Sequence, residues 1–176
     1  YSVEVKARDI AGNESVASAT QNFVVEVTVP EIEASVADLT IPSTLFTKDG
    51  DTVEVRAVFD ADRIDTSTLR ADLSAFGGRE WSIPREVGDG EAAWRVRGAV
   101  CSSRNGELVT TVTAADRFGR WTTGTATITA DNIIPWLVLT PQWPDPTNTN
   151  TVTLTGEAYD EAPGRVASVE YRLNGG

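Results

Sequence analysis

The chain has 176 residues, of which 40% are hydrophobic, and a formal net charge of -11 at pH 7. This length allows one or two domains with packed cores, whereas the negative charge argues against binding to nucleic acid or to anionic membranes. No run approaches the ~20 apolar residues of a membrane span. The sequence contains no histidine. It therefore lacks the usual general base of serine and cysteine nucleophiles, and we do not expect an enzyme.

Residues 1–30 are predicted to form the last hairpin of a β-module. Apolar and polar residues alternate over Tyr1–Ala7, which is typical of a half-buried antiparallel strand. The segment Asp9–Asn13 contains Asp-x-x-Gly, a turn signal, and a second strand region is expected over Ser15–Thr28. Pro30 closes this segment. Because the earlier strands of such a module are missing, we expect the chain to be part of a longer protein.

Residues 31–133 are predicted to form one complete immunoglobulin-like sandwich, because short strand patterns alternate with turn signals. The expected strands are Ile32–Val36, Thr52–Phe59, Leu69–Ala75, Glu80–Ile83, Ala92–Val100, Leu108–Ala115 and Trp121–Ala130. One inward row is predicted at Val53, Val55, Ala57 and Phe59, facing Trp94, Val96 and Val100, with Arg95 and Arg97 outside. Cys101 cannot form an intramolecular disulfide and is predicted to be a small core residue.

Residues 134–176 are predicted to begin a third module of the same kind. Its strands are expected at Trp136–Thr140, Thr151–Tyr159 and Val166–Leu173. No segment carries a convincing helical period, so the chain is predicted to be all-β. We interpret it as a tandem array of immunoglobulin-like β-sandwich repeats of about a hundred residues each, one complete and two partial.

Four stretches resemble the bacterial immunoglobulin-like surface repeats. They are Ala7–Asn13, Gly50–Val55, Ala114–Gly119 and Ser168–Gly176. Arg120 stands where the first copy has Asn13, which leaves open whether the two turns share one geometry. Such repeats occur in surface-layer proteins, adhesin stalks and secreted glycan-degrading enzymes. The resemblance implies an extracellular location and a spacer or scaffold role, and it implies no chemistry.

Acidic residues gather where successive modules should meet, and they are the candidate metal ligands. Strand direction should bring one group together at the N-terminal junction, near Glu31, and a second group at the C-terminal junction, near Asn132, Asp49 and Asp51. The first group is Asp60, Asp62, Asp65 and Asp116, and the second is Asp131, Asp160 and Glu161. Clustered carboxylates suit Ca²⁺, which takes six to eight oxygen ligands. The alternative is that aspartate is common in turns because it binds nearby backbone.

Tryptophan and asparagine suggest two further kinds of site. Trp81, Trp121 and Trp143 could be exposed and stack on sugars, whereas Trp94 is expected in the core and Trp136 at a joint between modules. Asn13-Glu14-Ser15 is an N-glycosylation sequon, which can also occur by chance.

We therefore expect a structural module of an extracellular, cell-surface or secreted multi-domain protein, acting as scaffold, surface-layer lattice element or adhesin stalk. The alternative is an accessory carbohydrate- or ligand-binding module attached to a secreted enzyme. The expected partners are neighbouring repeats, other copies of the chain or a cell-surface glycan, with Ca²⁺ as the possible cofactor. Nucleic acid is not expected as a partner.

Overall fold

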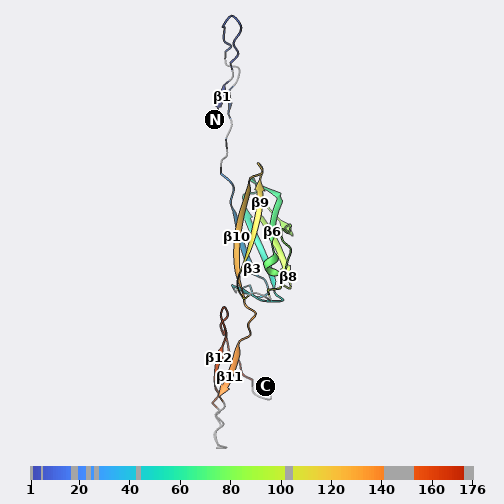
Figure 1. The fold of residues 1–176 in the computed structure, drawn as a ribbon, viewed down its shortest axis with the longest axis vertical. Coiled ribbons are helices and arrows are strands. Elements are labelled where there is room, and N and C mark those ends of the chain that lie inside the picture. The colour runs from blue at the N-terminus through green and yellow to red at the C-terminus, as the bar shows by residue number, and fades with distance from the viewer. Residues whose placement is uncertain are drawn as a thin grey trace, which may run out of the picture.

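The computed structural model describes residues 2–4, 6–16, 20–22, 25, 28–42, 45–101, 105–140 and 153–172. Within these ranges the chain is mostly β-sheet, without α-helix, and the one helical element is the short 3-10 helix η1 (Ser74–Phe76). Three β-structured parts follow one another along the long axis of the molecule (Figure 1). No helix of the described part is long and apolar enough to cross a membrane.

The N-terminal part is a two-stranded antiparallel sheet. Strand β1 (Ser2–Glu4) pairs with β2 (Thr20–Asn22), and an isolated bridge joins Arg8 to Glu14 near the turn. Within the described residues both strands are shorter than predicted, and residues 5, 17–19, 23–24 and 26–27 of the two predicted stretches lie outside the described ranges. Tyr1, the first residue of the expected strand, lies outside the described residues.

The central part, residues 31–133, is called the central unit below and contains two four-stranded sheets. The first has the order β3 (Ile32–Asp38), β5 (Thr52–Phe59), β8 (Glu91–Arg97) and β7 (Glu86–Val87). The second has the order β4 (Phe46–Thr47), β10 (Trp121–Ala130), β9 (Gly106–Asp116) and β6 (Ile64–Asp72). All pairs are antiparallel except β4 with β10. This arrangement is compatible with an immunoglobulin-like β-sandwich.

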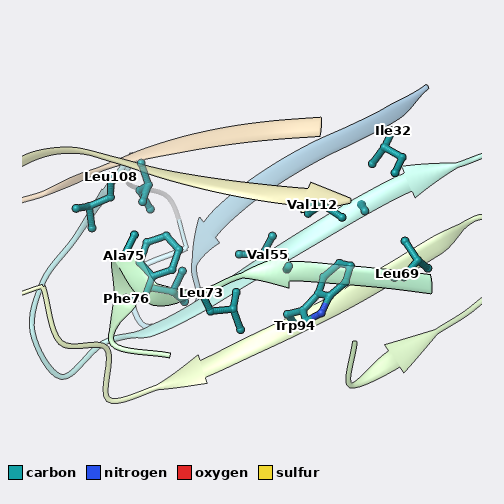
Figure 2. Close-up of a cluster of buried hydrophobic side chains, with 14 of the residues drawn as sticks. Ile32, Val55, Leu69, Leu73, Ala75, Phe76, Trp94, Leu108 and Val112 are labelled. Atoms are coloured by element: carbon teal, nitrogen blue, oxygen red, sulfur yellow. The ribbon is translucent and has the colours of Figure 1, made fainter. Parts of the chain in front are cut away.

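The core of the central unit lies between the two sheets. The predicted inward row of β5 is buried from Val53 to Phe59, as alternation along a strand requires. Trp94 is 1% exposed, and it points with Val55 and Val112 into the space between the sheets (Figure 2). Cys101 is also buried, as predicted, and burial raises the pKa of its thiol.

The inward row predicted for β8 is wrong at its end. Val100 is 59% exposed, and Ala99 is buried in its place. Gly98 adopts φ +63°, a left-handed conformation that favours glycine and interrupts the strand after Arg97. The alternation therefore shifts by one residue beyond this glycine.

Four predicted strands also need correction, and of these the strand predicted over Thr151–Tyr159 begins only at Thr155 within the described residues. The stretch Glu80–Ile83 forms only one bridge, between Ser82 and Ala71. The strand predicted at Leu69–Ala75 starts earlier, at Ile64, and ends at Asp72 because η1 follows. Residues 166–172 form no strand, and the end of that prediction, Leu173, lies outside the described residues.

The C-terminal part presents an uncovered apolar face. Strand β11 (Trp136–Thr140), predicted to the residue, pairs antiparallel with β12 (Thr155–Tyr159). A cavity of about 570 Å³ beside them is lined by Leu137, Leu139 and Leu154, each at least half exposed.

Candidate functional site

The two Asp-x-x-Gly turns have the same backbone geometry. The N–H of Gly12 donates to the carbonyl of Asp9 at 3.0 Å, and the N–H of Gly119 donates to the carbonyl of Asp116 at 2.9 Å. Both glycines have positive φ, at +92° and +78°. The open question about Arg120 is therefore answered: the turn is preserved.

Arg120 can replace asparagine because its side chain makes the equivalent hydrogen bond. Asn13 Nδ2 donates to Asp9 Oδ2 at 2.8 Å, and Arg120 Nε donates to Asp116 Oδ2 at 2.6 Å. The exposed sequon residue Asn13 is thus also part of its own turn.

The longer side chain of Arg120 also reaches the linker that precedes the central unit. Arg120 Nη2 donates to the carbonyl of Thr28 at 3.2 Å, and Arg63 Nη2 donates to the same carbonyl at 2.9 Å. Arg63 Nη2 also lies 3.2 Å from Thr28 Oγ1. We call Thr28, Arg63 and Arg120 the N-terminal latch. It joins the loop between β5 and β6 and the turn between β9 and β10 to the linker.

Asp116 supports this latch as a buried anion. Burial alone would raise its pKa, but the backbone N–H and guanidinium of Arg120, together with the N–H of Phe118, outweigh burial and lower it. Asp116 therefore stays ionised at neutral pH and orients Arg120 toward Thr28.

Two of the other carboxylates predicted at the N-terminal junction, Asp60 and Asp65, bind nearby backbone. Asp60 Oδ1 accepts the N–H of Asp62 at 3.0 Å, and Asp65 Oδ1 accepts the N–H and hydroxyl of Ser67. The Asp62 side chain is 99% exposed and lies 3.9 Å from Arg117. These contacts match the alternative interpretation of these aspartates as turn residues.

At the C-terminal junction, a loop of the central unit holds the outgoing linker. The N–H of Asp131 donates to the carbonyl of Thr47 at 2.9 Å, and the N–H of Asp49 donates to Asn132 Oδ1 at 2.7 Å. The N–H of Asn132 donates to Asn105 Oδ1 at 2.9 Å. We call these contacts the C-terminal tether.

Two of the predicted metal ligands, Asp131 and Asp160, converge just beyond this tether. A Cβ atom placed on Gly164 would lie 2.3 Å from Asp131 Oδ2 and 2.6 Å from Asp160 Oδ2. The two carboxylates therefore flank the glycine. Asp160 Oδ1 is buried and has no hydrogen-bond partner among the described residues. Paired carboxylates with an unused oxygen suit a hard cation.

The third predicted ligand, Glu161, contributes a backbone contact: its carbonyl accepts the N–H of Gly164 at 3.0 Å. Across the described ranges, no three Asp, Glu, Cys or His side chains form a group that could hold a metal ion. Calcium at either junction stays a prediction.

Gly164→Ala tests the calcium prediction. The added methyl group should push Asp131 and Asp160 apart, so any binding of Ca²⁺ in the range of roughly 0.1–1 mM typical of extracellular modules should be lost. Isothermal titration of the full chain with Ca²⁺ measures this. Gly88→Ala is the matched control, because its nearest contact is 4.0 Å away. A wild-type chain that binds no Ca²⁺ at millimolar concentration would contradict the prediction.

The tryptophans divide into buried and exposed residues. Trp94 lies in the core as predicted, and Trp136 is 47% exposed with its ring 5.5 Å from that of Tyr159. Trp81 and Trp121 are 52% and 62% exposed. Trp143 lies outside the described residues.

Comparisons of the sequence with models of protein families and with curated proteins find no match.

Proposed function

We propose that the chain is a structural module of an extracellular multi-domain protein, similar to the bacterial immunoglobulin-like surface repeats. In this role it holds neighbouring modules at a fixed spacing in a scaffold, a surface-layer lattice or an adhesin stalk. The observation that supports the proposal is that both linkers of the central unit are hydrogen-bonded to it.

The N-terminal latch restrains the incoming linker through charged donors. Arg63 and Arg120 come from different loops and meet at one carbonyl, that of Thr28. Hydrogen bonds that involve a charged group typically contribute about 1.5–3 kcal/mol each, and less where they are exposed to solvent. A linker held from two sides cannot rotate freely about its backbone. The latch therefore favours one orientation of the preceding module.

The C-terminal tether restrains the outgoing linker through hydrogen bonds donated by three backbone N–H groups. Asp131 and Asn132 are bound to the loop at Thr47–Asp49 and to Asn105. Pro135 then fixes its own φ angle before β11 begins. Together these features favour an extended, semi-rigid connection.

Arg63→Ala tests the spacer function. Residual dipolar couplings of the full chain should show one common alignment for β1–β2 and the central unit in the wild type. In Arg63→Ala the couplings of β1–β2 should be averaged toward zero, because the latch loses one of its two guanidinium groups. The stability of the central unit should change little.

Arg70→Ala is the matched control for this experiment. Arg70 Nη1 donates to the carbonyls of Ser67 and Leu69, which both lie in its own strand, β6. Arg70→Ala should therefore leave the common alignment of β1–β2 and the central unit unchanged. If the wild-type parts already align independently, or if Arg63→Ala and Arg120→Ala both keep the common alignment, the spacer proposal is wrong.

The alternative function is an accessory carbohydrate-binding module. One observation favours it: Trp81 and Trp121 expose more than half of their surface, and flat aromatic faces can stack on sugars. Quenching of tryptophan fluorescence by soluble glycans distinguishes this function from that of a spacer.

A further inference from the structure

Two buried carboxyl groups lie next to each other at the C-terminal pole of the central unit. Asp38 ends β3 and pairs in register with Val53, and Asp51 precedes Val53 by two residues. Paired residues and residues two apart share one face of a sheet. Asp38 and Asp51 therefore lie diagonally on the inner face, where they are 1% and 5% exposed.

Each carboxyl group uses one oxygen to hold backbone. Asp38 Oδ1 accepts the N–H of Thr40 at 2.6 Å and that of Ile41 at 3.2 Å. Asp51 Oδ2 accepts the N–H of Lys48 at 3.1 Å. Asp38 Oδ2 is buried and makes no hydrogen bond of normal geometry with any donor in the described part of the chain.

Strand register and burial place the two carboxyl groups side by side, each affects the pKa of the other, and the Thr47 hydroxyl also acts on Asp38. Two facing carboxylate oxygens need one hydrogen atom between them, since neither can donate when both are ionised. Their buried position makes two adjacent negative charges costly. Two carboxylates that already bind backbone N–H groups also offer few of the six to eight oxygens that Ca²⁺ needs.

We propose that Asp38 and Asp51 share one proton in the folded protein, and that losing it loosens the loop of residues 47–51 and with it the C-terminal tether. The carboxyl pair is coupled to the C-terminal tether because both involve the same loop of the chain. Asp51 ends this loop, and the loop supplies both the carbonyl of Thr47 that binds Asp131 and the N–H of Asp49 that binds Asn132. The stiffness of the junction then depends on pH. This inference rests on the carboxyl pair and does not require the proposed function.

The surroundings of the pair are mainly acidic. Burial and Asp38 raise the pKa of Asp51, and nearby Lys48 opposes this only in part. Burial alone would raise the pKa of Asp38 as well, but Asp51 and the N–H groups of Thr40 and Ile41 lower it, with help from the Thr47 hydroxyl. Cys101 also faces the pair together with Asp49, and burial and these carboxylates raise the pKa of its thiol.

The direction of the pH effect follows from these shifts. Because the pKa of Asp51 is higher in the folded state, its stabilising effect is complete below the unfolded pKa and is lost as the pH rises through the folded pKa. For Asp38 the pKa is lower in the folded state, so its contribution is lost as the pH falls through that value. The shared proton is therefore held between the two folded pKa values.

Hydrogen exchange of the full chain tests the proposal through the amides of Asp49 and Asp131. Between pH 4 and pH 8 their protection, corrected for the intrinsic exchange rate, should fall as Asp51 loses its proton. Asp51→Asn should abolish this dependence, because its amide donates to Asp38 Oδ2 at every pH. Asp65→Asn is the matched control at the opposite pole and should keep it.

Carbon NMR titration of the two carboxyl groups gives an independent measurement. Asp51 should titrate above the ordinary aspartate range and Asp38 below it. The proposal is overturned if both titrate in the ordinary range, or if protection of the two amides does not change with pH. It is also overturned if Ca²⁺, rather than acid, restores protection at pH 8, because the pair would then be a cation site.

Discussion

Replacing Trp94 by alanine is expected to destabilise the central unit by about 3–5 kcal/mol, the usual cost of removing a large buried aromatic side chain. Trp94 is 1% exposed and is among the largest fully buried side chains. Its Nε1 also donates to the carbonyl of Ser82 at 2.8 Å, which ties β8 to the segment before β7. The substitution therefore removes both packing and a hydrogen bond.

Urea unfolding of the full chain, followed by circular dichroism, measures this loss. Trp121→Ala is the matched control, because Trp121 is 62% exposed and an exposed substitution usually changes stability by less than about 0.5–1 kcal/mol. Similar losses for both variants would show that Trp94 is not central to the core. A domain of this size typically has a free energy of unfolding of only about 5–15 kcal/mol. Trp94→Ala should therefore leave the central unit only marginally stable.

Gly124→Ala is expected to have the second large effect: it should lower the free energy of unfolding by about 1–3 kcal/mol or more. Gly124 lies in β10, where this strand passes β3 of the other sheet. A Cβ atom at this position would lie 2.4 Å from the carbonyl oxygen of Ile32. That oxygen belongs to backbone, so the contact is relieved only if β3 and β10 move apart.

Thermal unfolding of Gly124→Ala and Gly88→Ala checks this prediction. Gly88→Ala makes the same chemical change where the nearest atom is 4.0 Å away, and it should leave the melting temperature almost unchanged. Equal effects of the two substitutions would mean that the close approach of β3 and β10 does not constrain the fold. A selective loss at Gly124 would show that this contact fixes the edge of the core.

The pattern of apolar residues predicted the strands where alternation is uninterrupted. Strands β5, β10 and β11 were predicted to the residue, and the inward row from Val53 to Phe59 is confirmed. The alternation fails after Gly98, where one left-handed residue exchanges the places of Ala99 and Val100. A local pattern specifies a face of a strand only as long as the strand continues.

The candidate site, too, was predicted from the sequence only in part. Acidic residues at the junctions were visible in the sequence, and strand direction placed Asp131 near Asp160. Nothing local showed that Arg63 and Arg120 would meet at Thr28, or that Asp116 would be held by Arg120. The signal that could have pointed to this was the replacement of asparagine by arginine in the second Asp-x-x-Gly turn.

By itself, the sequence determined the all-β class, the positions of the turns and the inward faces of the main strands, because these depend on the spacing of residues along the chain. Only the tertiary structure decided which side chains meet at the same end of the central unit. Asp38 and Asp51 are thirteen residues apart and become a buried pair because β3 and β5 lie in antiparallel register. The N-terminal latch likewise needs β6 to pair with β9, because this pairing brings Arg63 and Arg120 to one linker. Contacts of this kind depend on how strands meet, which no local pattern records.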